Sequence, residues 1–305
     1  MNQINQNLIE KGKKELKEDR ITVGLATCGI SAGALKTYEV LKKEGFNVKK
    51  TGCIGMCYCE PIVSVYKKGK KTIYGNVTEE NVNILIDSLK KNKVCKELFI
   101  GNSTNDIEFF KKQKRIVMDN CGKIEPLNFA QYLCNNGFKG LNEAIKLTPE
   151  KVIDLVLESK LRGRGGAGFY TGLKWKFTLN EDADMKYIIC NADEGEPGTF
   201  KDREILEQVA EKVFAGMAIA GYAIGAKEGY LYLRAEYNFL LKKLHAILID
   251  FNAFLQSNNI DFVIDIRSGS GAYICGEESA LFESMEGFRG EPRNKPPYPT
   301  KAGYN

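Results

Sequence analysis

The sequence predicts an α/β protein in which a smaller α/β domain is followed by a larger one with a largely parallel sheet. The main observation is a regular alternation of strand and helix patterns in the second half of the chain. The expected strands are 186–190, 229–233 and 261–266, and the helices between them are 203–226 and 236–256. Alternation of this kind is typical of a parallel sheet covered by helices. A second series of strand and helix patterns occupies residues 21–91. A length of 305 residues is typical of a protein with two domains.

The composition excludes several classes of protein. Lys and Arg number 44 against 39 Asp and Glu, so the net charge of +5 is too small and too dispersed to indicate nucleic-acid binding. Residues 1–20 are polar and lack the apolar region of a secretory signal, and no run of about 18 apolar residues predicts a membrane-spanning helix. Nine cysteines without a secretory signal favour a reducing, cytoplasmic location and a role in metal or redox chemistry.

The smaller domain is expected to have its elements in the order β-α-β-β-β-α. Alternating and helical apolar patterns place the strands at 21–26, 46–50, 62–66 and 72–74, and the helices at 31–44 and after Thr78. A stretch with a basic run, 92–128, follows as the expected linker. Pro149 then marks the first turn of a helix that extends to Leu161 and is capped by Thr148.

Four cysteines of the smaller domain are candidate metal ligands. Cys53, Cys57 and Cys59 fall within seven residues in a loop between strands, and Cys28 lies in an earlier loop. A [2Fe–2S] cluster takes four thiolates, so a cluster is the favoured interpretation. The spacing in the sequence supports Cys59 less well than the other three cysteines as a ligand. The alternative is a set of reduced thiols with a structural role.

The most informative stretch is 161–177, which contains five glycines within ten residues: Gly163, Gly165, Gly166, Gly168 and Gly172. Glycine lets a backbone approach a ligand closely, and consecutive exposed N–H groups form an anion site that nearby cations strengthen. The cations are Arg162, Arg164, Lys174 and Lys176, and the aromatic walls are Phe169, Trp175 and Phe177. We therefore predict a phosphate-binding loop beside a flat ring system, in preference to a glycine-rich turn that binds nothing.

The spacing Gly163-x-Gly165-x-x-Gly168 also matches the dinucleotide-binding fingerprint, which requires a strand before it and a helix after it. Here the preceding segment is the expected helix 149–161. The following segment contains Gly172 and has no helical apolar stripe, so no helix is indicated there. A self-sufficient Rossmann dehydrogenase is therefore disfavoured.

Polar residues follow the expected strands of the parallel sheet, where ligands of such sheets bind. Asn191, Asp193, Glu194 and Glu196 follow the first strand, and Gly269, Gly271 and Gly276 follow the third. Carboxylates accept hydrogen bonds from hydroxyl-rich ligands; the alternative is a solvated turn. Glu277 and Glu278 fall at a helix start, where the helix dipole stabilises carboxylates.

Three long motifs resemble the family of flavin-binding NADH dehydrogenase subunits, which serves respiratory complex I, NAD-linked hydrogenases and NAD-linked formate dehydrogenases. They are 162–169 with 172–175, 190–203, and 273–281, and with flanking sequence the resemblance covers about residues 110–299. The first domain is similar to the thioredoxin-like [2Fe–2S] ferredoxin, although it has only Cys28 where that domain normally offers two cysteines. The implied fold is a thioredoxin-like domain followed by a Rossmann-like α/β FMN-binding domain.

The resemblance also implies site residues. FMN would be held by Gly163, Arg164, Gly165, Gly166, Lys174, Asn191, Asp193, Glu194, Gly276 and Glu277. The NADH or NADPH site would be lined by Phe169, Phe177, Glu196, Glu278, Lys295 and Tyr298. The implied catalytic residues are Glu194 and Glu278, and the implied cluster ligands are Cys28, Cys53, Cys57 and Cys59. The single histidine, His245, is expected on the surface of an amphipathic helix, and flavin hydride chemistry does not need it because the cofactor performs the hard step.

The expected domain boundaries are a polar segment 1–20, the ferredoxin-like domain 21–91, a linker 92–128, the FMN/NADH domain 129–299 and a truncated end 300–305. The family normally continues into a β-grasp-like domain and a domain with a [4Fe–4S] cluster, which this chain is expected to lack. The expected function is electron entry, in which NADH or NADPH reduces FMN and electrons pass to the iron–sulfur clusters of a hydrogenase, formate dehydrogenase or complex I-like assembly. The alternative is a non-catalytic partner or assembly module without flavin.

Overall fold

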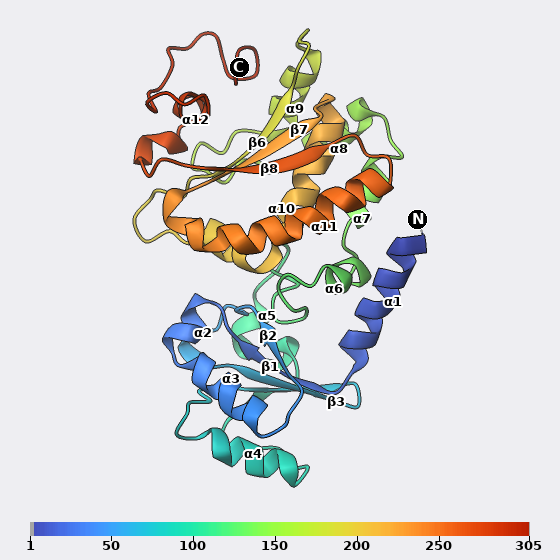
Figure 1. The fold of residues 1–305 in the computed structure, drawn as a ribbon, viewed down its shortest axis with the longest axis vertical. Helices are drawn as coiled ribbons and strands as arrows, with labels where there is room; N and C mark the ends of the chain where they lie inside the picture. Colours follow the sequence, from blue (N-terminus) through green and yellow to red (C-terminus); the bar gives the residue numbers. More distant parts are fainter. Residues whose placement is uncertain (1–2, 305) are drawn as a thin grey trace. The chain divides into compact units, whose positions relative to one another are not determined.

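The computed structural model describes residues 3–304, so Met1, Asn2 and Asn305, at the ends of the expected segments 1–20 and 300–305, lie outside the described residues. The backbone contacts divide the chain into two units, one made of 3–135 with 207–209 and the other of 136–206 with 210–304. Each unit has a sheet of its own, which confirms the predicted α/β class (Figure 1).

The first unit contains a mixed sheet in the order β2-β1-β3-β4-β5. Its strands are β1 (Arg20–Gly24), β2 (Val48–Thr51), β3 (Val63–Lys67), β4 (Lys70–Tyr74) and β5 (Phe99–Gly101). The central strand β1 runs parallel to β2 and antiparallel to β3, and β3 forms a hairpin with β4. Every residue of β1 is buried, because helices and loops cover both faces of this strand. The arrangement is thioredoxin-like, as predicted.

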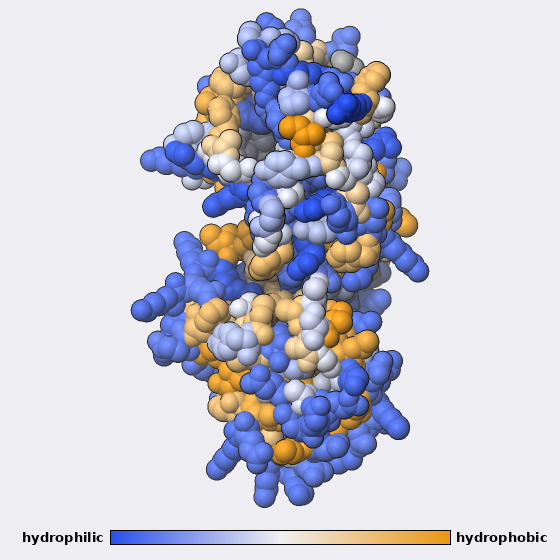
Figure 2. All heavy atoms as spheres, turned by 90° about the vertical axis from the view of Figure 1, so that its left-hand side faces the viewer, coloured by the Kyte–Doolittle hydropathy of each residue, from blue (hydrophilic) through white to orange (hydrophobic). Residues whose placement is uncertain are grey.

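The helices of the first unit flank this sheet. They are α1 (Gln3–Lys17), α2 (Thr27–Ser31), α3 (Ala34–Lys43), η1 (Cys57–Cys59), α4 (Val82–Lys90), η2 (Thr104–Asp106), α5 (Glu108–Lys111) and α6 (Phe129–Cys134). Apolar side chains of α3 and α4, including Leu41 and Leu85, pack on Val23 and Val63 of the sheet. The lower part of Figure 2 shows hydrophobic residues among the charged ones on the surface of this unit, and Ile30 and Tyr58 are among its exposed apolar side chains (Figure 2).

Two segments outside the expected domain 21–91 belong to this unit. The polar segment 1–20 contains the helix α1, which packs against α6 so closely that a Cβ atom on Gly12 would lie 2.2 Å from the carbonyl oxygen of Ala130. The expected linker 92–128 contains β5, η2 and α5, and its Phe110 packs with Met56 in a small apolar cluster.

The second unit contains a parallel sheet in the order β6-β7-β8, as predicted. Its strands are β6 (Tyr187–Ala192), β7 (Glu228–Leu233) and β8 (Val263–Ser268). The helices are α7 (Lys139–Ala144), α8 (Pro149–Glu158), α9 (Thr171–Asn180), α10 (Lys201–Ile224), η3 (Ala235–Leu240), α11 (Leu241–Ser257), η4 (Tyr273–Gly276) and α12 (Glu278–Met285). Figure 1 shows α10 and α11 along one face of this sheet (Figure 1).

The core of the second unit is largely aromatic near α10 and α11. Phe138 stacks on Phe254 with ring centroids 4.1 Å apart, and Phe214 packs edge-on to Phe251. His245 is exposed on α11, as predicted. None of the helices between residues 3 and 304 combines the length and the apolar composition that a membrane crossing requires.

Candidate functional site

The glycine-rich stretch forms an exposed loop closed at its base. Arg162 and Tyr170 form an antiparallel bridge, and the Gly163 N–H donates to the Phe169 carbonyl at 2.9 Å. Gly166 and Gly168 adopt φ angles of 109° and 63°, which favour glycine. A Cβ atom placed on Gly165 or Gly166 would meet no atom within 4 Å. The backbone at the tip of this loop is therefore open to a ligand, as the predicted phosphate site requires.

The loop joins two helices, which corrects one prediction. The interpretation that no helix follows Gly168 is wrong, because α9 begins at Thr171. Gly172 lies where α9 presses on α8, since a Cβ atom there would be 2.7 Å from the Leu157 nitrogen. Trp175 of α9 packs against an apolar cluster that includes Ile153 of α8, so these two contacts hold α9 on α8 although α9 lacks a long apolar stripe. The element directly before the loop is the helix α8 and not a strand. This agrees with the prediction that the dinucleotide fingerprint lacks the strand that should precede it.

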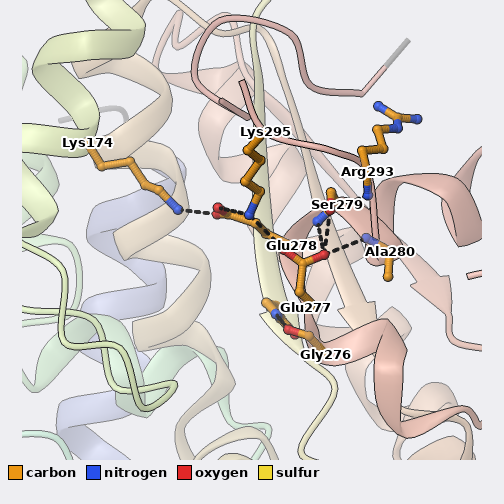
Figure 3. Close-up of polar contacts among 9 residues, drawn as sticks. Lys174, Gly276, Glu277, Glu278, Ser279, Ala280, Arg293 and Lys295 are labelled. Atoms are coloured by element: carbon orange, nitrogen blue, oxygen red, sulfur yellow. Dashed lines mark hydrogen bonds and ion pairs between the residues drawn. The ribbon is translucent and has the colours of Figure 1, made fainter. Parts of the chain in front are cut away.

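Four charged side chains form a network beside this loop (Figure 3). Lys174 of α9 pairs with Glu278 of α12 at 2.7 Å, and Lys295 pairs with Glu277 at 2.8 Å and with Glu278 at 3.4 Å. Glu277 also caps α12 by accepting hydrogen bonds from the backbone of Ser279 and Ala280. Burial alone would raise the pKa of Glu277, but the hydrogen bonds from Lys295 and Ser279 outweigh burial and lower this pKa to about 2. Glu277 is therefore a fixed negative charge.

The loops that follow β6 and β8 are in contact at the carboxyl end of the sheet. The Asn191 side chain donates to the Gly276 carbonyl at 2.8 Å. The ring of Tyr273 lies against Gly195, where a Cβ atom would be 2.7 Å from Tyr273 Cδ2. The Tyr273 hydroxyl also donates to Glu196 at 3.4 Å. Together with the Lys174–Glu278 pair, these contacts bring the three sequence motifs to one place.

Asp193 carries an oxygen suited to a hydroxyl-bearing ligand. Its Oδ2 atom is buried and has no hydrogen-bond partner in the part of the chain that the structure describes. Burial raises the pKa of Asp193 to about 6, against the opposing effect of Arg234. An orphaned buried oxygen is costly, so a ligand that donates a hydrogen bond to Asp193 is favoured.

Glu194 is placed differently from its predicted neighbours. Its side chain is almost fully buried and accepts hydrogen bonds from the Asp202 N–H at 2.9 Å, the Arg203 N–H at 3.4 Å and the Tyr237 hydroxyl at 2.8 Å. These donors belong to the first turn of α10 and to η3. In the structure Glu194 holds the acidic loop to these elements, and its contact with FMN and its catalytic role remain predictions.

A cavity of about 340 Å³ lies next to the charged network. Lys174, Asn191 and Glu278 of the predicted set line it. The predicted aromatic residues Phe169, Phe177 and Tyr298 are exposed and do not line it. Trp175, which was predicted as an aromatic wall, lines the cavity, whereas sequence reasoning missed Tyr187, Ile189 and Tyr304 among the other residues of its wall. Tyr187 is a polar-tipped aromatic at the start of β6, and this is the only signal that could have indicated it.

Three of the four predicted cluster ligands converge in the first unit. The sulfur atoms of Cys28, Cys53 and Cys57 lie within 4.8 Å of one another, and those of Cys53 and Cys57 are 3.8 Å apart. Cys28 comes from α2, Cys53 from the loop after β2, and Cys57 begins η1. Cys59 is not in this group and packs against an apolar cluster that includes Ile62. The structure therefore brings together a three-thiol centre, hereafter the cysteine centre.

Fold and geometry together define the second unit as a parallel α/β domain with an exposed glycine-rich loop beside a network of charged side chains. Residues 156–304 match the family model of the Nuo51 FMN-binding domain. The chain is 50% identical over 200 residues to HndC, from the NADP-reducing hydrogenase of Solidesulfovibrio fructosivorans, covering 64% of this chain and 41% of that protein. It is 40% identical over 268 residues to the alpha subunit of the NAD-reducing hydrogenase HoxS of Cupriavidus necator, covering 85% and 43%.

Two further similarities come from a different enzyme and from a solved structure. One of the NADH-quinone oxidoreductase subunits of Escherichia coli is 42% identical over 187 residues, covering 59% of this chain and 42% of that protein. A crystal structure of an NAD+-reducing [NiFe]-hydrogenase in the H2-reduced state matches with a TM-score of 0.54 and 27% identity, covering 98% of this chain and 55% of that chain. The chain thus spans less than half the length of the three relatives from S. fructosivorans, C. necator and E. coli.

Proposed function

We propose that this chain is an electron-entry flavoprotein that binds FMN and oxidises NADH or NADPH. The main observation behind the proposal is that the three sequence motifs, 162–175, 190–203 and 273–281, lie in contact at one site. The Lys174–Glu278 and Asn191–Gly276 contacts join them. The match of residues 156–304 to the Nuo51 FMN-binding domain supports the choice of FMN. Two relatives are named as reducing NADP and NAD respectively, so both nucleotides belong to the proposal.

The residues present fit FMN. The open backbone at Gly165 and Gly166, with Arg164 and Lys174 nearby in sequence, suits a phosphate group. The orphaned oxygen of Asp193 suits a hydroxyl donor such as those of the ribityl chain. When bound, FMN supplies the conversion of a two-electron hydride transfer into single-electron steps. In this proposal Glu278 and Lys295 position the nicotinamide nucleotide, and the exposed rings of Phe169 and Phe177 close over it.

The destination of the electrons is proposed to be an assembly that contains a hydrogenase. The alignment with the HoxS alpha subunit covers 85% of this chain, so it includes part of the first unit as well as the FMN-binding domain. We further propose that the cysteine centre holds a [2Fe–2S] cluster in a cytoplasmic protein, because three convergent thiols suit iron–sulfur ligation. Formate dehydrogenase and complex I-like assemblies are the other candidate partners.

A visible spectrum tests this proposal against the alternative of an assembly module without flavin. The purified chain, incubated with FMN and desalted, is expected to retain bound flavin and its absorption bands. A protein that stays colourless after incubation with FMN would contradict the enzyme proposal and favour the alternative of an assembly module. Turnover of NADH with an organic substrate and no flavin would instead indicate a Rossmann dehydrogenase.

We expect Lys174→Ala to weaken FMN binding about tenfold at low salt, which corresponds to about 1.4 kcal/mol. The Lys174 ammonium is proposed to attract the FMN phosphate, and salt screens such an attraction between partly exposed charges. Raising the ionic strength should therefore shrink the difference from the unmodified protein. Flavin fluorescence titration measures both affinities. Lys242→Ala removes the same charge from an exposed position on α11 and serves as the control. Equal affinities for all three proteins would reject the role of Lys174.

A further inference from the structure

The cysteine centre offers three ligands, whereas a [2Fe–2S] cluster requires four. Cys59 was the sequence-based candidate for the fourth position. In the structure its side chain packs with Ile62, Ile73 and other members of an apolar cluster, outside the group of converging sulfur atoms. The fourth ligand must come from another residue near Cys28, Cys53 and Cys57, if the proposed cluster is bound.

Glu60 is the acidic residue that lies at the cysteine centre. Its Oε1 atom is 3.8 Å from Cys28 Sγ. Its Oε2 atom accepts a hydrogen bond from the Ile62 N–H at 2.7 Å, which fixes the orientation of the carboxylate. The Glu60 residue is only 7% exposed.

Two glycines make the space that the Glu60 carboxylate fills. A Cβ atom on Gly24 would lie 3.2 Å from both carboxylate oxygens, and one on Gly29 would lie 3.3 Å from Oε2. Both contacts are tighter than ordinary van der Waals contact. The end of β1 and the helix α2 thus form a cradle that brings the carboxylate up to the thiol of Cys28.

The distance from Cys28 to Glu60 equals a distance within the cysteine centre, whose three sulfur atoms all lie within 4.8 Å of one another. Cys53 Sγ and Cys57 Sγ are 3.8 Å apart, and so are Cys28 Sγ and Glu60 Oε1. On one tetrahedral metal, two thiolates with bonds of about 2.3 Å are separated by about 3.8 Å, and a thiolate and a carboxylate oxygen with a bond of about 2.1 Å by about 3.6 Å. Both distances are therefore close to the spacing of two ligands on one iron.

We propose that the Glu60 carboxylate, and not the Cys59 thiol, is the fourth ligand of the cluster in the first unit. This inference rests on the proposed [2Fe–2S] cluster and names the ligand set of that site. Non-cysteine ligands occur in [2Fe–2S] proteins, where histidine replaces two cysteines on one iron and raises the reduction potential. The proposed set is three thiolates, from Cys28, Cys53 and Cys57, and one carboxylate.

The test compares three variants of the whole chain after anaerobic reconstitution with iron and sulfide. We expect roughly two irons and two sulfides per chain in the unmodified protein and in Cys59→Ser. Glu60→Gln preserves the volume and the acceptor for the Ile62 N–H but replaces the anionic ligand with a neutral amide, so it should lose at least four-fifths of the iron. Glu60→Cys should keep both irons, and its absorption bands should shift to longer wavelength because a thiolate replaces an oxygen ligand.

The outcomes distinguish an error in the assignment of Glu60 as a ligand from an error in the proposal of a cluster. Full iron in Glu60→Gln, or a Glu60→Cys spectrum identical to that of the unmodified protein, would overturn the role of Glu60. Loss of iron in Cys59→Ser would overturn the exclusion of Cys59. An unmodified protein with one iron and no sulfide, or with no iron, would overturn the proposed cluster first. Far-UV circular dichroism identifies unfolded variants, and the Glu60→Cys spectrum decides the assignment even if Glu60→Gln does not fold.

Discussion

Changing Cys53 to serine is expected to remove most of the iron that the first unit binds after anaerobic reconstitution. The same result is expected for Cys28→Ser and Cys57→Ser, because the three sulfur atoms lie within 4.8 Å of one another and share one site. Serine is nearly the same size as cysteine but is a much weaker ligand for iron. We expect each variant to retain less than about one fifth of the iron, since a [2Fe–2S] cluster depends on each of its thiolates.

Cys134→Ser is the matched control for this prediction. Cys134 belongs to the same unit, at the end of α6, and its thiol donates to the Gln131 carbonyl at 3.3 Å, away from the cysteine centre. Its replacement should leave the iron content unchanged. If Cys53→Ser bound as much iron as Cys134→Ser, the three thiols would be structural and the proposed cluster would have to be abandoned.

A second large effect is expected from Glu194→Ala, which should destabilise the second unit by about 3 kcal/mol. The change leaves the Tyr237 hydroxyl and two N–H groups of α10 without their acceptor, and hydrogen bonds to charged groups contribute about 1.5–3 kcal/mol each at most. For a unit of this size, the loss corresponds to a fall of roughly 10 °C in Tm. Thermal unfolding followed by circular dichroism measures it.

The control for Glu194 is its neighbour Glu196, which lies in the same loop but is exposed. Glu196→Ala should change the free energy of unfolding by less than about 0.5 kcal/mol, as is usual for surface substitutions. Glu194→Gln should fall between the two, because the amide oxygen still accepts hydrogen bonds. Equal stabilities of Glu194→Ala and Glu196→Ala would show that the Glu194 contacts do not hold the acidic loop in place.

The regular elements could be predicted where local patterns and packing agree. The strands β6, β7 and β8 are short apolar runs separated by long helices, and this pattern specifies a parallel sheet before any contact is known. The helix α9 could not be predicted in the same way, because its burial comes from the close approach of Gly172 to Leu157. A glycine that permits such packing looks like a helix breaker in the sequence.

The site was predictable in its motifs but not in its pairings. Lys174 and Glu278 are separated by more than a hundred residues, and only the fold places them 2.7 Å apart. Tyr304 likewise reaches the cavity wall through a ring contact with Tyr187 that no spacing in the sequence indicates. Glu60 could not be singled out from the sequence, because its proposed role depends on the space left by Gly24 and Gly29.

The central claim is that this chain takes electrons from a nicotinamide nucleotide into FMN. The most direct test is an anaerobic titration of the FMN-loaded chain with NADH and, separately, with NADPH, followed by the visible absorption of the flavin. The account predicts that at least one of the two nucleotides bleaches the oxidised flavin bands without any organic substrate. Bound flavin that stays oxidised in the presence of an excess of both nucleotides would contradict it.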